Sequence, residues 1–164
     1  MKYESIDSKL FIKNRANFSR EMKKNSIAFF NSNDIYPVSA DSTLPFEQHR
    51  DIFYLSGIDQ EESILVLCPD NPNPDLREIL FLKETNDHIA VWEGPKINKT
   101  QALEISGIKT VFWLKDLEKL VDKLVSTCHN IYFNKNEHYR AKIETETREA
   151  RFNIWLEKKY PKKK

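Results

Sequence analysis

The side chains that could bind a metal ion or attack a substrate are scattered along this sequence. A catalytic metal needs three or four converging ligands, and a helical spacing such as HExxH supplies two of them. No such spacing occurs, and the four histidines fall in separate predicted elements, at His49, His88, His129 and His138. Ser56 and Ser106 lack the two flanking glycines of a GxSxG nucleophile elbow. The sequence therefore predicts no catalytic residue and no metal ligand in this chain.

Two pairs of potentially reactive side chains have simpler structural interpretations. The adjacent carboxylates Glu61 and Glu62 lie in an acidic turn, which we expect to be solvated. Cys68 lies in an apolar run, and Cys128 comes 60 residues later without a CxxC spacing. We therefore expect both cysteines to be reduced thiols in or near the core.

Trp92 and Asp41 are the two residues for which the sequence leaves a binding role open. Trp92 follows a short apolar run and precedes Glu93, Gly94 and Pro95, a turn that would carry a large rigid ring to the edge of the fold. Such a ring either fills a ligand subsite or a partner's pocket, or covers the local core. Asp41 lies in a segment, residues 36–45, that we expect to be an irregular loop; it either caps its own backbone or faces a partner's charge.

Composition excludes several other functions. The chain has 164 residues, which is enough for one domain, and its net charge of +1 gives no general attraction to nucleic acid or anionic lipid. Its three glycines are too far apart for a phosphate-binding loop, and no run approaches the 18 apolar residues of a membrane span. The N-terminal residues mix both charges before any apolar stretch, unlike a secretory signal, so we expect a cytoplasmic protein.

The order of predicted elements indicates an α/β fold. Aliphatic runs at 64–68 and 78–82 are typical of strands covered on both faces. Further strands are predicted at 26–30, 52–55, 109–113 and 130–133, and helices at 8–24, 98–106, 114–125 and 139–158. We expect a roughly six-stranded sheet flanked by helices on both faces.

Two ordered blocks then resemble the N-terminal domain of Xaa-Pro aminopeptidases (aminopeptidase P), in the creatinase, prolidase and aminopeptidase P family. Residues 45–57 read PFEQHRDIFYLSG and precede the strand ILVLC; they are similar to the family's YPFRQDSxFYYLTGF stretch, with Glu47 where the pattern has arginine. Residues 90–94 read AVWEG, and with 99–108 they resemble the WxGxR…A…G(I/V) region. The resemblance implies a mixed sheet with a ribonuclease H-like motif. It also implies that residues 1–161 form this domain and that 162–164 begin a linker to a pita-bread catalytic domain.

The resemblance also implies the activity of a parent enzyme. Family members hydrolyse the peptide bond before proline in Xaa-Pro-Yaa peptides, with two divalent metals, usually Mn²⁺, bound by the catalytic domain. We therefore expect this segment alone to bind no cofactor and to be inactive. Its expected partners are its own C-terminal catalytic domain, the peptide, and further copies in a dimer or tetramer. The alternatives are the N-terminal domain of a prolidase or creatinase-like amidinohydrolase, and a stand-alone protein-interaction module.

Two residues receive roles from the resemblance. Trp92 matches the tryptophan that projects toward the active site of a neighbouring subunit, which predicts that it borders the bound peptide. Asp41 corresponds to an acidic residue in a loop that faces the catalytic domain, which predicts an interdomain contact.

Overall fold

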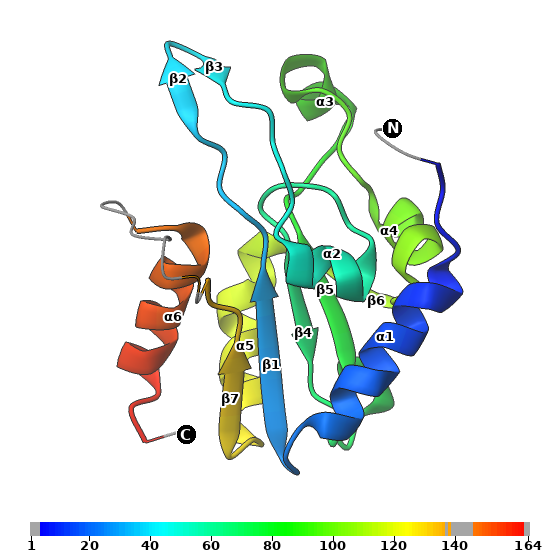
Figure 1. The fold of residues 1–164 in the computed structure, drawn as a ribbon, viewed down its shortest axis with the longest axis vertical. Coiled ribbons are helices and arrows are strands. Elements are labelled where there is room, and N and C mark those ends of the chain that lie inside the picture. The colour runs from blue at the N-terminus through cyan, green and yellow to red at the C-terminus, as the bar shows by residue number, and fades with distance from the viewer. Residues whose placement is uncertain (1–3, 137, 139–145, 163–164) are drawn as a thin grey trace.

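The chain folds around a five-stranded mixed sheet in the computed structural model, which describes residues 4–136, 138 and 146–162 (Figure 1). The strand order is β6-β5-β4-β1-β7. The central pairs β1/β4 and β4/β5 are antiparallel, whereas the outer pairs β1/β7 and β5/β6 are parallel. The strands are β1 (Ser26–Asn31), β4 (Ile64–Leu67), β5 (Glu78–Leu82), β6 (Thr110–Trp113) and β7 (Asn130–Phe133).

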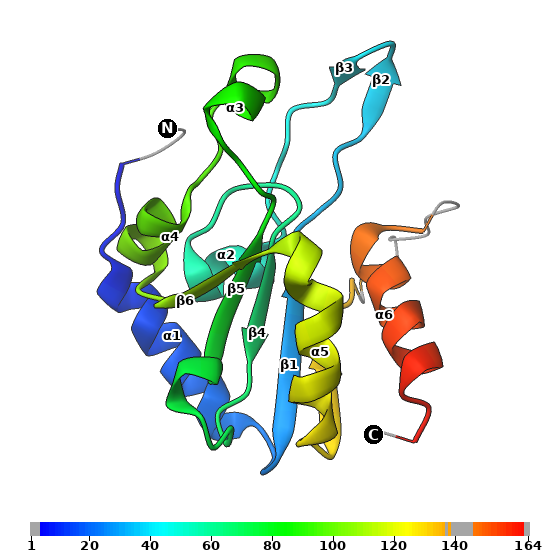
Figure 2. The ribbon, with the colours of Figure 1, turned by 180° about the vertical axis from the view of Figure 1, so that it is seen from behind.

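Helices cover both faces of this sheet, as predicted. One face packs against α5 (Leu117–Ser126) and α6 (Arg148–Lys159), and the other against α1 (Ser8–Glu21), α2 (Arg50–Ser56) and α4 (Lys99–Ser106) (Figures 1 and 2). Alternate residues of each strand supply the two cores; Phe29 faces α6, and Phe30 faces α1. The period-2 geometry of a strand explains why its residues are buried on both sides.

The prediction of a sixth sheet strand at 52–55 is wrong, because this segment lies within helix α2. Ile52, Leu55 and Ser56 are buried at the helical spacing i, i+3, i+4, while Tyr54 is 58% exposed. The His49 side chain accepts a hydrogen bond from the backbone N–H of Asp51 at the start of the helix. A run of four apolar residues cannot distinguish a period of 3.6 from a period of 2, so this short run was assigned to the wrong element.

Two other segments differ from their predictions. The expected irregular loop at 36–45 contains a separate hairpin, formed by β2 (Pro37–Ser39) and β3 (Ser42–Thr43). The opening helix ends at Glu21 rather than at residue 24. The predicted start of the closing helix, residues 139–145, lies outside the described residues, and α6 is described from Arg148. Short helices complete the described chain: η1 (Pro74–Leu76), α3 (Asp87–Glu93) and η2 (Leu114–Asp116).

Cys68 and Cys128 are buried and free, as predicted, but the structure also makes them neighbours. Their Sγ atoms lie 3.4 Å apart, in the core on the α5 side of the sheet. The hydrogen bond between the two thiols, and then burial, raises the pKa of Cys68 above its usual value. The Cys68 thiol is therefore a poor nucleophile, which fits a packing role.

Candidate functional site

Two projections extend from one end of the molecule. One is the hairpin β2/β3, and the other is an arm, residues 83–96, which leaves the sheet after β5, carries α3 and returns to α4 (Figures 1 and 2). Both projections expose apolar side chains, namely Val38, Leu44, Val91 and Trp92. Exposed apolar groups gathered on projections are typical of contact surfaces, so this end is the candidate functional site.

Trp92 is an exposed residue of the arm. It belongs to α3, a helix whose first turn is capped by the Asn86 side chain, which accepts a 2.9 Å hydrogen bond from the Ile89 N–H. The helix ends at Gly94, whose φ of 76° and ψ of 169° form a conformation that is essentially restricted to glycine. The Trp92 side chain is 81% exposed. The ring therefore does not cover the local core, which was one of its two open interpretations.

Asp41 lies in the tight turn between β2 and β3, at the tip of the hairpin. It is exposed, and the structure gives its carboxylate no hydrogen bond or ion pair within the described chain. The neighbouring Ala40 adopts a φ of 50°, which completes the turn. Asp41 and Trp92 are not brought together, since Figure 1 places the hairpin and α3 on separate projections.

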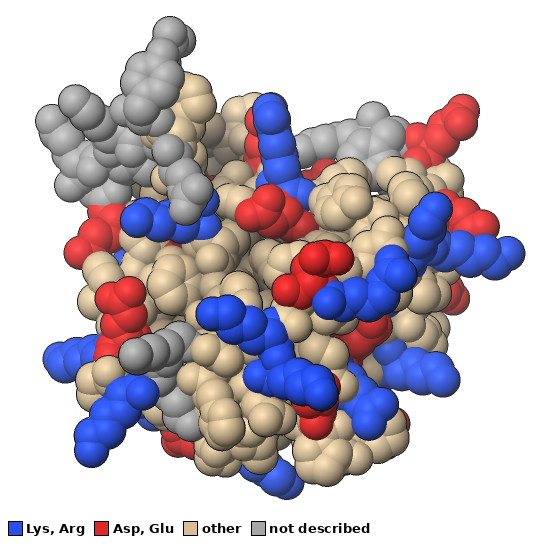
Figure 3. Space-filling model, turned by 60° about the horizontal axis from the view of Figure 1, so that its bottom comes forward, with Lys and Arg blue, Asp and Glu red and all other residues tan. Residues whose placement is uncertain are grey.

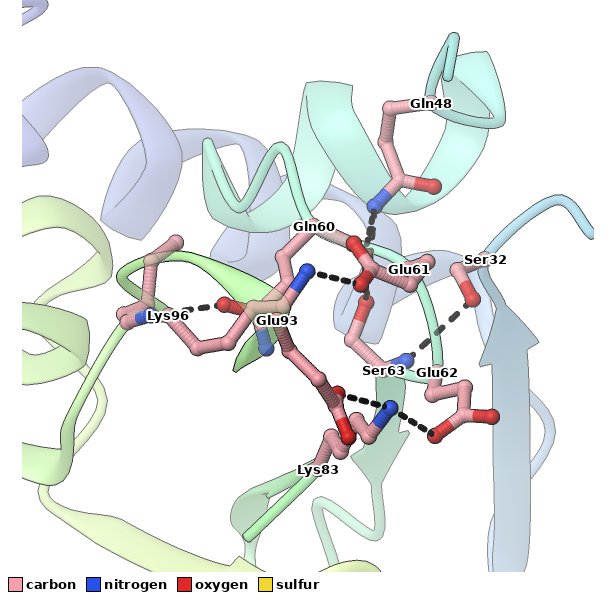
Figure 4. A network of polar contacts seen from close by, with 10 residues as sticks. Ser32, Gln48, Gln60, Glu61, Glu62, Ser63, Lys83, Glu93 and Lys96 are labelled. Carbon is pink, nitrogen blue, oxygen red and sulfur yellow. Dashed lines mark hydrogen bonds and ion pairs between the residues drawn. The ribbon is translucent and has the colours of Figure 1, made fainter. Parts of the chain in front are cut away.

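A network of polar side chains surrounds the base of the arm (Figure 4). Lys83, directly after β5, lies 2.6 Å from Glu93 and 3.8 Å from Glu62. On the returning side, Lys96 forms an ion pair with Glu61. The hydrogen bond with Glu93 raises the pKa of Lys83, and the same bond lowers the pKa of Glu93.

The expectation that Glu61 and Glu62 form a solvated turn is wrong for Glu61. Its side chain is only 9% exposed, and that of its partner Lys96 is 16% exposed. Lys96 occupies the basic position of the WxGxR pattern. A basic residue at this position was the one feature of the sequence that indicated an acidic partner. The identity of that partner, 35 positions earlier, depends on the fold.

Gln48, a polar residue of the first motif block, has a structural role. The Gln48 side chain donates to the backbone oxygens of Ile58 and Gln60, at 3.0 and 2.9 Å, and so fixes the turn that precedes β4. Gln60 in turn accepts a 2.6 Å hydrogen bond from the backbone N–H of Ile97. The first motif block is therefore connected to the returning side of the arm through this turn.

A hollow of about 630 Å³ lies beside the base of the arm. Its wall includes Phe11, Gly57, Lys96, Ile97 and Glu104. Neither Trp92 nor Asp41 lines it, although the returning end of the arm does, through Lys96.

Across residues 4–136, 138 and 146–162, no group of three His, Cys, Asp or Glu side chains could hold a metal ion. The same ranges contain no helix that is both long and apolar enough to cross a bilayer. Basic and acidic side chains are interspersed on the face seen in Figure 3.

Comparison with known proteins identifies the domain. A family model described as "Aminopeptidase P, N-terminal domain" matches residues 11–132. Xaa-Pro aminopeptidase 3 of Homo sapiens is 25% identical over 117 residues, which are 70% of this chain and 23% of the human protein. Xaa-Pro aminopeptidase of Escherichia coli is 22% identical over 138 residues, covering 84% of this chain and 31% of that protein.

The fold is also found in solved structures. That of a putative aminopeptidase P from Bacillus anthracis superposes with a TM-score of 0.81 at 24% identity, covering 96% of this chain and 37% of the other. This chain thus spans between about a quarter and two fifths of the proteins to which it is similar. Because the family model covers most of its length, the chain belongs to the aminopeptidase P N-terminal domain family.

Proposed function

We propose that this chain is the non-catalytic N-terminal domain of a metal-dependent Xaa-Pro aminopeptidase, and that it shapes the substrate cleft and contributes to subunit contacts. The named relatives are Xaa-Pro aminopeptidases, and each is about three to four times as long as its aligned part. One structure of the Escherichia coli enzyme is described as zinc-substituted and in complex with product. The metal ligands of the parent would belong to the catalytic domain that the family resemblance implies.

The observation that carries the proposal is the exposure of Trp92 on the arm. An indole ring buries a large area on contact and loses little rotamer freedom, so it is well suited to line a peptide cleft. Asp41, on the other projection, is available to a basic group of the catalytic domain. Both residues would act by binding and by excluding water from the cleft. Neither would bind a metal ion.

The test uses the full-length protein with Mn²⁺ and an Xaa-Pro-Yaa peptide. Trp92→Ala should lower kcat/KM by about 10-fold, which corresponds to about 1.4 kcal/mol. Tyr54→Ala is the matched control, because Tyr54 is an exposed aromatic residue on α2, away from the arm. Equal activity of the Trp92 variant and the control would refute the role of the ring.

The parent reaction is tested with the same protein. Hydrolysis of Xaa-Pro-Yaa tripeptides and longer peptides supports the aminopeptidase. Exclusive hydrolysis of Xaa-Pro dipeptides would instead indicate a prolidase, and hydrolysis of creatine an amidinohydrolase. The 164-residue chain alone should hydrolyse none of these substrates, and activity in it would contradict the proposal.

A further inference from the structure

The arm has little support of its own beyond its base. The described hydrogen bonds of α3 remain inside the arm: the N–H groups of Ile89 and Ala90 both bond to Asn86, each at 2.9 Å. Val91 and Trp92 are exposed rather than packed on the sheet. In Figure 1 the helix stands clear of the end of the sheet. The direction of the ring must therefore be set where the arm joins the body.

The first contact at the base joins the two ends of the arm. Lys83 is the first residue after β5, and Glu93 is the last residue of α3, directly after Trp92. Their 2.6 Å ion pair joins the segment that leaves the sheet to the segment that returns to it. Glu62 lies 3.8 Å from the same ammonium and belongs to the turn before β4, so the contact is also anchored to the body (Figure 4).

The second contact holds the returning segment of the arm, at Lys96, against the same turn. Lys96 pairs with Glu61, and both side chains are largely buried. The next residue, Ile97, donates its backbone N–H to the Gln60 side chain. Burial reduces the screening of this pair by solvent and salt, and losing either partner alone would leave the other charge buried and unpaired.

From this geometry we infer that Lys83 and Lys96 are positioning residues, whose ion pairs with Glu93 and Glu61 fix the direction in which the arm holds Trp92. Any effect on peptides rests on the proposed function, whereas the effect on the order of the ring does not. Lys83 is the better residue to test, because its pair is partly exposed and its loss should leave the fold intact. Substitution of Lys96 alone would leave Glu61 buried and unpaired, so it is combined with Glu61→Gln.

The first experiment measures the motion of the ring in the 164-residue chain. Trp113→Phe and Trp155→Phe leave Trp92 as the only tryptophan, and nanosecond fluorescence anisotropy decay reports its wobble. Lys83→Met should raise the amplitude of the fast component about twofold, and Lys96→Met with Glu61→Gln should raise it at least as much. Lys83→Arg should restore the wild-type decay because it keeps the charge.

The control is Lys159→Met. Lys159 pairs with Asp122 at 3.0 Å on the α5/α6 side, with an exposure of 27% against 29% for Lys83, and it does not contact the arm. It should leave the decay unchanged. The inference is overturned if Lys83→Met gives the same decay as this control, provided that circular dichroism shows both variants folded.

The second experiment measures hydrolysis by the full-length protein. Lys83→Met should raise KM for an Xaa-Pro-Yaa peptide by about 3-fold or more with a smaller change in kcat, and it should have no further effect in the Trp92→Ala background. A looser ring in Lys83→Met, with full activity in Trp92→Ala, supports the positioning role and refutes the proposed function. An unchanged ring in Lys83→Met, with reduced activity in Trp92→Ala, refutes the positioning role and leaves the proposed function standing.

Discussion

Replacing Gly57 with alanine should destabilise the domain for two reasons that the structure separates. Gly57 ends helix α2 in the left-handed region, with a φ of 71°. A Cβ atom there would lie 2.3 Å from Cε2 and 2.5 Å from Cζ of Phe11, whose ring is buried. The substitution therefore combines backbone strain with a steric clash in the packing of α1 on α2.

The magnitude follows from these two terms. The left-handed conformation costs an alanine about 1–2 kcal/mol relative to glycine. Forcing an extra carbon into a packed core costs typically about 1–3 kcal/mol. The sum is about 2–5 kcal/mol, a large part of the usual stability of a domain. For a chain of this length we expect a fall in Tm of about 4–20 °C.

Gly94→Ala is a control that adds backbone strain without a clash. The φ of 76° and ψ of 169° of Gly94 lie in a region even less accessible to alanine than that of Gly57, but a Cβ at this position meets nothing within 4 Å. Strain in the arm can relax without disturbing the core, so the Tm should fall by about 2 °C or less. Thermal and urea unfolding of the 164-residue chain, followed by circular dichroism, compare the two variants.

A double-mutant cycle tests the clash directly. Phe11→Leu removes the ring atoms that the new Cβ would meet. The combination of Phe11→Leu and Gly57→Ala should therefore be less destabilised than the sum of the single variants, by about 1 kcal/mol or more. Additive effects, or equal falls in Tm for Gly57→Ala and Gly94→Ala, would refute this account of the packing.

Three other predictions follow from buried or paired charges and thiols. Arg15 is fully buried, lies 2.9 Å from the partly exposed Glu78 and donates a hydrogen bond to the Leu55 carbonyl, so Arg15→Met should reduce the free energy of unfolding by about 1–3 kcal/mol in urea titrations, mainly by leaving that carbonyl unpaired; an unchanged stability would contradict this. Cys68 and Cys128 are buried, and the pKa of Cys68 is raised, so a thiol reagent should label neither in the native chain at pH 8 and both after unfolding; rapid native labelling would be inconsistent with this packing. The hydrogen bond with Lys83 lowers the pKa of Glu93 in the folded chain. The ion pair is therefore fully formed above the unfolded pKa of about 4.5, and it is lost as the pH falls through the lower folded pKa. The wobble of Trp92 should increase over that acid range, and a constant wobble would argue against the pair.

The main elements of the fold could be predicted because their signals are local. The aliphatic runs of β4 and β5, and the helical periodicity of α5, each lie within one element. The hairpin β2/β3 was missed because its strands are exposed and very short, so no apolar alternation marks them. The extent of the domain, the oligomeric state and the cytoplasmic location were predicted from residues or resemblance and stay predictions.

The contacts at the base of the arm and the contact between the two cysteines could not be predicted, because they join residues that are far apart in the sequence. Glu61 and Lys96 are 35 positions apart, and Cys68 and Cys128 are 60 apart. Each single residue has an ordinary local interpretation, as a turn carboxylate, a motif cation or a core thiol. Only the register of the sheet and the path of the chain decide which of them meet. This is why the position of Trp92 at the edge of the fold could be predicted from the sequence, whereas the contacts at the base of the arm could not.

The motif residues divide according to whether the domain itself requires them. Gln48 orders the turn before β4, and Gly57 permits the close approach of Phe11; both would be needed for this fold alone. Trp92 contributes to neither core, and its exposed ring forfeits the stabilisation that burial would provide. Two ion pairs nevertheless hold the arm that carries it. A side chain that costs the isolated domain burial energy and still has a built support is best explained by a surface outside this chain, which the catalytic domain or neighbouring subunit of the proposed enzyme would supply.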